Sequence, residues 1–381
     1  MGVIGHLVFW LCGSLIVYVY VGYPVMVWTL ARIAGRDVAR RAIRPTVTVV
    51  IAAYNEERGI RAKLDNVMDL EYPSDLLDVI VTSDASADTT DAIVCAYDPS
   101  HVRLVRVEGR CGKTACQNIA VQSATGEIVV FTDATTRIDP HALIALVENF
   151  ADPSVGCAAG SLVYETTGHN RTGQGGAAYW SYELGLRRGE SALGSLVGVS
   201  GCLYAVRRSA YRPIAPELIS DFVIAMRLYE QGLRTVLEPA AICFEETLEE
   251  SGQELAMRVR VAVRSINALI AERRLLNPLR FGRYSWQLWS HKVLRYASPF
   301  VWLIALGTSL ALGQNPLYLG LFALQLLLIA AGVAGFLLHA RAQRLGLLTK
   351  PYYFLLTNVA SFLATLRYLK GERIVTWKPI R

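Results

Sequence analysis

Charged residues are scarce in this sequence of 381 residues. Asp, Glu, Lys and Arg make up 18% of it, against 53% hydrophobic residues, whereas a typical soluble domain carries about 25% charged residues. The scarcity argues against an ordinary soluble protein. The high apolar content excludes a disordered chain.

Several nucleotide-binding and metal-binding motifs are absent as well. No G-x-G-x-x-G follows the first predicted strand and no G-x-x-x-x-G-K-[ST] occurs, which argues against a dinucleotide dehydrogenase and a P-loop NTPase. The seven cysteines include no C-x-x-C pair, so we expect reduced thiols in a cytosolic domain rather than a zinc cage or disulfide framework. The six histidines show no metal-ligand spacing, and nothing resembles a nucleic-acid-binding module.

The apolar excess is concentrated at the two ends of the chain. Residues 6–33 carry no charge before Arg32, which is long enough for a bilayer core that needs about 20 apolar residues. They lack the basic start of a cleaved signal peptide, so a retained anchor is predicted. The arginines that follow are Arg32, Arg36, Arg40, Arg41 and Arg44. By the positive-inside rule they place the N-terminus outside and the next domain in the cytoplasm.

Two more apolar runs lie near the C-terminus, at residues 298–312 and 316–338, with basic residues before the first and after the second. This pattern predicts a helical hairpin that enters the membrane from the cytoplasm and returns. Residues 281–296 are predicted as an interfacial helix or as the first part of a longer spanning helix. Residues 352–369 carry Lys or Arg at both ends. This pattern favours an interfacial or re-entrant helix over a third C-terminal helix that spans the membrane.

Between these ends the composition is that of a globular enzyme. Strands are predicted at residues 47–53, 78–83, 103–107, 127–132, 156–164 and 234–243, and helices at residues 57–70, 89–96, 113–124 and 222–231. This alternation predicts an α/β fold with a mostly parallel sheet. The expected domains are an anchor with its basic flank (1–44), the α/β domain (45–275), an interfacial helix with the hairpin (276–350), and a C-terminal helix with a tail (351–381).

Polar residues follow three of the predicted strands. Tyr54-Asn55-Glu56-Glu57 follows the first strand, Asp84 the second and Asp133-Ala134-Thr135 the fourth. In an open α/β sheet, ligands bind beyond the carboxyl ends of the strands. A carboxylate-rich edge without a glycine-rich phosphate loop predicts a Mg²⁺ or Mn²⁺ ion that bridges to phosphates, with Asp133 as a ligand and Thr135 helping directly or through water. Taken singly, Asp84 is equally well a helix N-cap or turn residue, and Asp133 a residue of the turn at the strand end.

Four segments, in order, carry a family resemblance: V-V-I-A-A-Y-N-E-E, S-D-A-S-A-D-T-T, G-K-T-A-C-Q-N-I-A and V-V-F-T-D-A-T. They resemble the donor-binding half of family 2 glycosyltransferases, which have the Rossmann-like GT-A fold, and the resemblance covers about residues 45–274. It implies nucleotide contacts for Ala53, Tyr54, Glu56, Asp84 and Lys113, and a metal contact for Asp133. The family usually has Asp-x-Asp at the metal motif, whereas Thr135 stands in its third position here.

Two later segments resemble the acceptor side of the same family. Ser200-Gly201-Cys202 begins a stretch similar to the loop that faces the acceptor, and I-S-D-F-V-I-A-M-R-L places Asp221 at the catalytic aspartate. An acceptor hydroxyl that attacks an anomeric carbon needs a proton acceptor within hydrogen-bond reach. With one base and no second nucleophile, the reaction is a single displacement, which inverts the configuration of the anomeric carbon. The alternative is that Asp221 caps the helix at residues 222–231.

A basic helix follows, with Arg258, Arg260 and Arg264; the last two lie one turn apart and share a face. Guanidinium groups suit a diphosphate leaving group, and the alternative is a helix near anionic lipid. Related hyaluronan, cellulose and chitin synthases carry Q-x-x-R-W here, but around Arg264 this chain has Val261 in place of the Gln and Ser265 in place of the Trp. The missing Trp, which stacks on acceptor sugar in those enzymes, argues against processive polymerisation.

The tail at residues 374–381 resembles the gating loop of those synthases. The resemblance implies that Trp377 and Arg381 close over the donor diphosphate, and the alternative is an interfacial anchor. The net charge of +6 comes mostly from juxtamembrane arginines, which favour anionic lipid over nucleic acid as a partner.

Together these features predict a membrane-embedded, metal-dependent, inverting glycosyltransferase of the bacterial inner membrane, with its catalytic domain and C-terminus in the cytoplasm. It would move sugar from a UDP-sugar, or another nucleotide diphosphate sugar, to a lipid-linked or polysaccharide acceptor at the membrane. A processive synthase is the main variant; a homo-oligomer would supply further walls for its channel. The rival hypotheses are a membrane-anchored nucleotidyltransferase, which releases pyrophosphate, and an inactive scaffold that binds nucleotide sugar.

Overall fold

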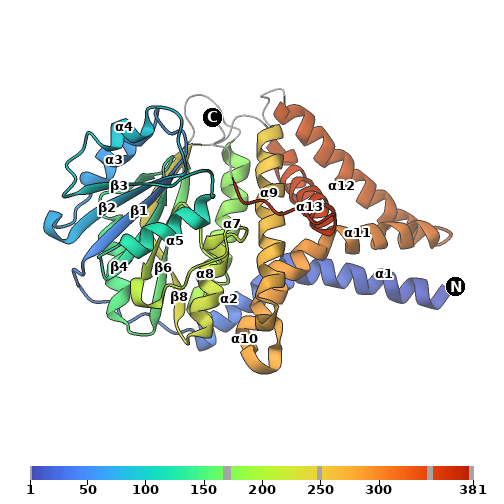
Figure 1. The fold of residues 1–381 in the computed structure, drawn as a ribbon. Helices are drawn as coiled ribbons and strands as arrows, with labels where there is room; N and C mark the ends of the chain where they lie inside the picture. The colour runs from blue at the N-terminus through green and yellow to red at the C-terminus, as the bar shows by residue number, and fades with distance from the viewer. Residues whose placement is uncertain (1, 166–172, 247–250, 341–345, 377–381) are drawn as a thin grey trace. The chain divides into compact units, whose positions relative to one another are not determined.

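The computed structural model describes residues 2–165, 173–246, 251–340 and 346–376 (Figure 1). The chain forms two compact units. The first, here the helical unit, comprises residues 1–33, 166–186 and 247–372, and the second, the sheet unit, comprises residues 34–165, 187–246 and 373–381. Each unit is described by itself.

The sheet unit is built on a mixed sheet with the strand order β3-β2-β1-β4-β7-β6-β8-β5 among the described residues. Its strands are β1 Val47–Ala53, β2 Leu77–Ser83, β3 Val102–Arg106, β4 Ile128–Asp133, β5 Arg137–Ile138, β6 Val155–Glu165, β7 Leu203–Arg207 and β8 Arg234–Glu246. Strands β3, β2, β1 and β4 run parallel to one another. Strand β7 is antiparallel to both β4 and β6, and β6 is parallel to β8. The predicted α/β fold with a mostly parallel, Rossmann-like sheet is confirmed.

Strand β1 shows why these segments form the centre of the sheet. Its sequence V-T-V-V-I-A-A is rich in β-branched residues and almost wholly buried, as expected for a parallel strand covered on both faces. Its register pairs Ala53 with Ser83 of β2 and Ala52 with Asp133 of β4. The carboxyl ends of β1, β2 and β4 therefore meet at one edge of the sheet.

Helices connect and cover these strands: α3 Ile60–Met68, α4 Thr90–Val94, α5 Lys113–Ser123, α6 Ala142–Glu148 and α8 Ser220–Glu230. Helix α5 packs against β1 and β2, and it crosses in front of the sheet in Figure 1. Helices α6 and α8 pack against β6 and β8. Helix α3 begins three residues later than predicted, because the Glu56 carbonyl accepts hydrogen bonds from the N–H groups of Gly59 and Ile60 in a turn.

The helical unit contains α1 Gly2–Val17, α2 Tyr23–Ala34, α9 Ser251–Ala271, α10 Pro278–Leu288, α11 Leu294–Ala311, α12 Pro316–Ala340 and α13 Thr349–Leu369. Helix α7 (Gly173–Leu193) begins in this unit and ends in the other. Two short π-helical segments, Tyr18–Gly22 and Trp289–Val293, join α1 to α2 and α10 to α11.

Among the described helices, three are long and apolar enough to cross a membrane: Val3–Ala34, Pro278–Ala311 and Pro316–Leu338. The second shows that residues 281–296 continue into the apolar run after them, as in the longer-helix alternative, although Gly282 has non-helical backbone angles. Helix α13, over the segment predicted as interfacial or re-entrant, is not among the three. The three helices agree with an integral membrane protein.

Candidate donor-binding and catalytic site

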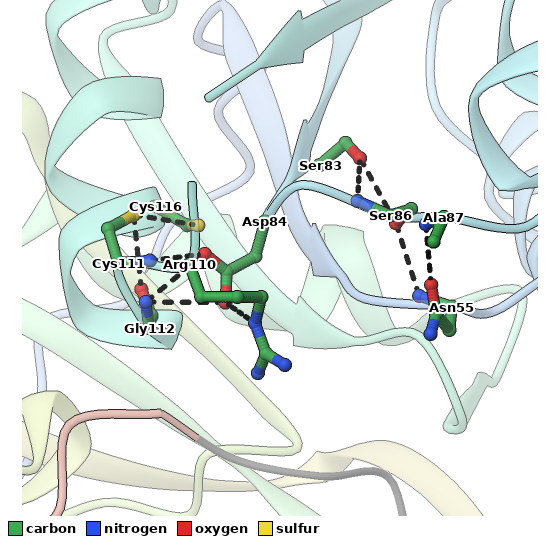
Figure 2. Close-up of polar contacts among 9 residues, drawn as sticks. All are labelled: Asn55, Ser83, Asp84, Ser86, Ala87, Arg110, Cys111, Gly112 and Cys116. Carbon is green, nitrogen blue, oxygen red and sulfur yellow. Dashed lines mark hydrogen bonds and ion pairs between the residues drawn. The ribbon is translucent and has the colours of Figure 1, made fainter. Parts of the chain in front are cut away.

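Asp84 organises one end of the candidate site (Figure 2). It follows β2 and is fully buried. Its carboxylate accepts hydrogen bonds from the backbone N–H groups of Cys111 (2.7 Å) and Gly112 (3.2 Å) and pairs with Nε of Arg110 at 2.9 Å. The guanidinium of Arg110 lies over the ring of Tyr54, 3.3 Å from its centroid. Asp84 therefore binds the loop before α5 to the strand ends. The N-cap of α4 is Thr89, so Asp84 does not cap that helix, and the alternative of a turn residue stays open.

The loops after β1 and β2 hold one another in a strained conformation. Asn55 and Ala85 have left-handed backbones, with φ of 53° and 55°, which costs about 1–2 kcal/mol for a residue such as alanine. The side-chain oxygen of Asn55 accepts a hydrogen bond from Ala87 N–H at 2.8 Å, and Asn55 N–H donates to Ser86 Oγ at 3.1 Å (Figure 2). Strain held in this way is concentrated at ligand-binding loops.

Two other predicted nucleotide contacts lie in the same loops. Ala53 is buried at the end of β1, and its carbonyl accepts a hydrogen bond from Asp84 N–H at 2.8 Å. Glu56 N–H donates to Thr90 Oγ1 at 2.8 Å. Ala53, Tyr54, Glu56 and Asp84 thus belong to one connected edge of the sheet unit, and their contacts to a nucleotide remain predictions.

Lys113, Asp133 and Asp221 converge on Gly201. Lys113 is the first residue of α5, Asp133 the last of β4, and Asp221 lies in the first turn of α8. The Lys113 ammonium forms an ion pair with Asp133. A Cβ atom at Gly201 would lie 3.0 Å from Asp221 Oδ2, 3.1 Å from Lys113 Nζ and 3.8 Å from Asp133 Oδ2. The glycine leaves open a cradle between two carboxylates and an ammonium.

The charges in this cradle are coupled. Burial by itself lowers the pKa of Lys113, but the carboxylates of Asp133 and Asp221 outweigh burial and raise it above its usual value. The ammonium therefore stays charged at neutral pH and holds the two carboxylates near each other.

Asp221 is the second residue of α8, whereas the N-cap position belongs to Ile219. Asp221 therefore does not occupy the N-cap position of α8, and the alternative that it caps this helix is wrong. The carbonyl of Asp221 accepts a hydrogen bond from Val199 N–H at 3.0 Å, which holds the segment containing Ser200, Gly201 and Cys202 against the start of α8. The predicted acceptor loop is short, because strand β7 begins at Leu203.

Lys63 lies beneath the metal motif and was not predicted. Its buried ammonium donates hydrogen bonds to Thr132 Oγ1 at 2.8 Å and to the Thr136 carbonyl at 2.6 Å. Burial lowers the pKa of Lys63 to about 7, against the opposing charge of Asp133. Its signal in the sequence is a lysine between Ile60 and Leu64, on the face of α3 that the helix buries.

Lys63 makes stability depend on pH. Its pKa is about 7 in the folded chain and its ordinary value is 10.5, so between these values the unfolded chain binds the extra proton. Stability then rises as pH increases through this window and is lost as pH falls towards 7. We expect the melting temperature of the wild type, minus that of Lys63→Met, to increase from pH 7 to pH 9.5. A constant difference would contradict the assignment.

The described part of the tail lies against the loop before α5. Gly112 has φ of 88°, and a Cβ atom there would lie 2.3 Å from the carbonyl oxygen of Val375. Segment 373–376 therefore packs directly on the loop that binds Asp84. Trp377 and Arg381 lie outside the described residues, so their contact with the donor diphosphate remains a prediction.

Gly112→Ala is expected to displace this tail, because the added methyl group cannot share space with the Val375 carbonyl. The matched control is Gly109→Ala, where φ is 74° but no atom lies within 4 Å of the added Cβ. Both variants carry backbone strain of about 1–2 kcal/mol, and only Gly112→Ala has the steric clash. Trypsin should cleave after Arg373 several-fold faster in Gly112→Ala than in Gly109→Ala. Equal rates would show that the tail does not rest there.

The remaining predicted site residues are placed as follows. Thr135 is exposed in the turn after Asp133, and its role as a metal ligand remains a prediction. Arg260 and Arg264 lie on α9 of the helical unit, where Arg264 is buried. Arg258, on the same helix, pairs with Glu254 at 2.8 Å. The catalytic roles of Arg260 and Arg264 remain predictions.

The mixed, mostly parallel sheet of the sheet unit is that of the GT-A fold. Residues 48–214 match the family model described as Glycosyl transferase family 2. The chain therefore contains a domain of that family, and the resemblance read from its motifs is confirmed.

Two curated relatives are poly-beta-1,6-N-acetyl-D-glucosamine synthases. The chain is 25% identical over 266 residues to a poly-beta-1,6-N-acetyl-D-glucosamine synthase of Staphylococcus epidermidis, covering 66% of this chain and 64% of the relative. It is 25% identical over 264 residues to the synthase of the same name from Staphylococcus aureus strain COL, with the same coverage. The match thus spans less than two thirds of the length of these relatives.

A solved structure resembles nearly the whole fold. It is the mannosyltransferase PcManGT from Pyrobaculum calidifontis in complex with GDP-Man and Mn²⁺, with a TM-score of 0.73, 23% identity, and coverage of 96% of this chain and 100% of that one. At this identity the likeness establishes the fold.

Proposed function

We propose that this protein is a membrane-embedded, inverting glycosyltransferase that moves a sugar from a nucleotide diphosphate sugar to an acceptor at the membrane. The observation that carries the proposal is the convergence of Lys113, Asp133 and Asp221 on Gly201. Transfer needs a base for the acceptor hydroxyl and positive charge for the departing diphosphate. These three side chains supply both at the carboxyl ends of the strands.

In the proposed mechanism, Asp221 accepts the proton of the acceptor hydroxyl as its oxygen attacks the anomeric carbon. The C–O bond to the diphosphate breaks in the same displacement, and the nucleoside diphosphate leaves with both electrons. Lys113 then balances charge on the phosphates. Asp84, through the Arg110 loop and Tyr54, holds the surface on which the nucleoside lies. A single displacement inverts the anomeric configuration.

A divalent cation fits this site. Asp133 offers hard, partly exposed carboxylate oxygens beside the glycine cradle, which is the ligand chemistry that Mg²⁺ and Mn²⁺ prefer. Asp133 would hold the ion, with Thr135 beside it. Bound there, the ion would neutralise diphosphate charge during departure.

The proposed setting is the bacterial inner membrane. Arg36, Arg40 and Arg44 follow the first candidate span, which favours a cytoplasmic catalytic domain and an outside N-terminus. The acceptor is then a lipid-linked oligosaccharide or a growing exopolysaccharide. Since the curated relatives make poly-N-acetylglucosamine, UDP-N-acetylglucosamine is the first donor to test, and a processive synthase is the main variant.

The test is nucleotide release by the detergent-purified full chain with membrane lipid extract. UDP-N-acetylglucosamine, UDP-glucose, UDP-galactose and GDP-mannose are each supplied with Mn²⁺, with Mg²⁺ or with EDTA. The proposal predicts release of a nucleoside diphosphate from one donor, and none with EDTA. Pyrophosphate release would favour the nucleotidyltransferase, and metal-dependent nucleotide binding without turnover would favour the scaffold.

A further inference from the structure

The metal motif of this chain supplies one carboxylate where its family usually supplies two. Asp133 stands in the first position, and the third holds Thr135, a neutral side chain exposed to solvent. An ion held by Asp133 alone would depend almost wholly on the substrate phosphates and water. The structure brings another carboxylate, Glu245, towards the same turn.

Strand pairing places Glu245 beside the metal motif. Strands β5 and β8 are antiparallel, with Arg137 opposite Phe244 and Ile138 opposite Cys243. The next position in this register sets Glu245 opposite Thr136, at the end of the turn that begins with Asp133. Side chains alternate along a strand: the Phe244 ring lies under the Arg137 guanidinium at 4.1 Å, so Glu245 points to the other face.

Hydrogen bonds tie Glu245 to the cradle. The Cys202 thiol donates to Glu245 Oε2 at 3.6 Å, and the Cys202 carbonyl accepts from Thr132 Oγ1 at 2.9 Å. Cys202 follows Gly201, and the side chains of Asp133 and Asp221 lie on either side of the space next to the Gly201 Cα atom. Cys202 thus connects Glu245 to two parts of the site. One is strand β4, which ends in Asp133, and the other is the loop of residues 200–202 beside Asp221.

The electrostatics of Glu245 are those of a carboxylate near a second carboxylate. Asp133 lies near enough for its charge to act on Glu245, as does the Lys113 ammonium. Two nearby carboxylates in a partly buried site repel each other unless a cation lies between them. A divalent ion would satisfy both.

We propose that Glu245 is the second protein carboxylate of the divalent-cation site, in place of the acid that the motif lacks at Thr135. This inference rests on the proposed function, because it concerns the ion held by Asp133. It makes the cation site a product of two strands, β4 and β8, rather than of one motif.

The experiment measures Mn²⁺ binding directly. Mn²⁺ is titrated into the detergent-purified full chain, alone and with UDP or GDP, and free Mn²⁺ is followed by electron paramagnetic resonance. Glu245→Gln should weaken Mn²⁺ binding by about 10-fold to 100-fold. The matched control is Glu127→Gln, the same change at the amino end of β4, where Glu127 is exposed and pairs with Arg207. It should leave Mn²⁺ binding unchanged.

A second substitution separates a ligand from a structural role. Thr135→Asp, which restores the usual motif, should return Mn²⁺ affinity to Glu245→Gln if Glu245 supplies the second carboxylate. If Glu245→Gln does not fold, the Mn²⁺ affinity of Thr135→Asp alone decides between the outcomes. A change in this affinity of less than about threefold supports a site that already has two carboxylates. A tightening of about tenfold or more overturns the proposal.

The outcomes distinguish the two proposals. Wild-type binding in Glu245→Gln, with loss in Asp133→Asn, overturns the role of Glu245 and leaves the proposed function standing. A loss in Glu245→Gln that Thr135→Asp does not restore also overturns it. No Mn²⁺ binding by the wild type removes the metal-dependent function itself, whereas binding that survives Asp133→Asn places the ion elsewhere and overturns the roles of both Asp133 and Glu245.

Discussion

Asp221→Asn is expected to reduce the turnover number by about 10²-fold to 10⁴-fold while leaving nucleotide binding nearly unchanged. A positioned general base contributes a rate factor of this size, and asparagine keeps the shape of the side chain but cannot accept the hydroxyl proton. The Asp221 carboxylate lies beside Gly201, whereas Asp84 is bound by the loop of residues 110–112. The surface for the nucleoside should therefore remain intact. Steady-state release of nucleoside diphosphate and equilibrium nucleotide binding, measured on the same preparation, check both parts.

The matched control for this variant is Asp75→Asn. Asp75 is exposed in the short 3-10 helix before β2, at the amino end of that strand and away from the site. It should retain wild-type turnover. If Asp221→Asn also retains it, another group accepts the proton and the role assigned to Asp221 is wrong.

Asp133→Asn is expected to reduce turnover strongly as well, and unlike Asp221→Asn it should also change nucleotide binding. It removes the carboxylate proposed to hold the ion and the partner of the Lys113 ammonium. A metal ion that stabilises developing charge contributes several kcal/mol to the transition state, so turnover should fall by about 10³-fold or more. Nucleotide binding should also lose its dependence on Mn²⁺, unlike in Asp221→Asn. Mn²⁺-dependent nucleotide affinity in Asp133→Asn equal to that of wild type would place the ion elsewhere.

The strand pattern of the donor half could be read from the sequence because its strands are buried on both faces. Strand β1 was predicted to the residue, Val47–Ala53, since an uninterrupted β-branched run has few other solutions. Strand β7 was missed: Leu203–Arg207 is a short strand in a stretch whose motif pointed to a loop. Its antiparallel pairing with β4 and β6 is a tertiary feature that local sequence does not specify.

The site was predicted unevenly for a similar reason. Asp84 and Asp133 follow strands directly, so the topology of a parallel sheet brings them to one edge. Lys63, Arg110 and Glu245 reach the same edge from a helix, a loop and a distant strand. Their places depend on pairings and packing over many residues, such as the register of β5 with β8. Only the lysine on the buried face of α3 left a local signal.

The stereochemistry of the product tests the central claim most directly, namely that one carboxylate, Asp221, drives a single displacement at the cradle of Gly201. Once the donor is known, the wild-type enzyme transfers from that α-linked nucleotide sugar, and nuclear magnetic resonance reads the anomeric configuration of the new bond. The account predicts a β-linked product and none from Asp221→Asn. An α-linked product would contradict it, because a single in-line displacement inverts the anomeric carbon.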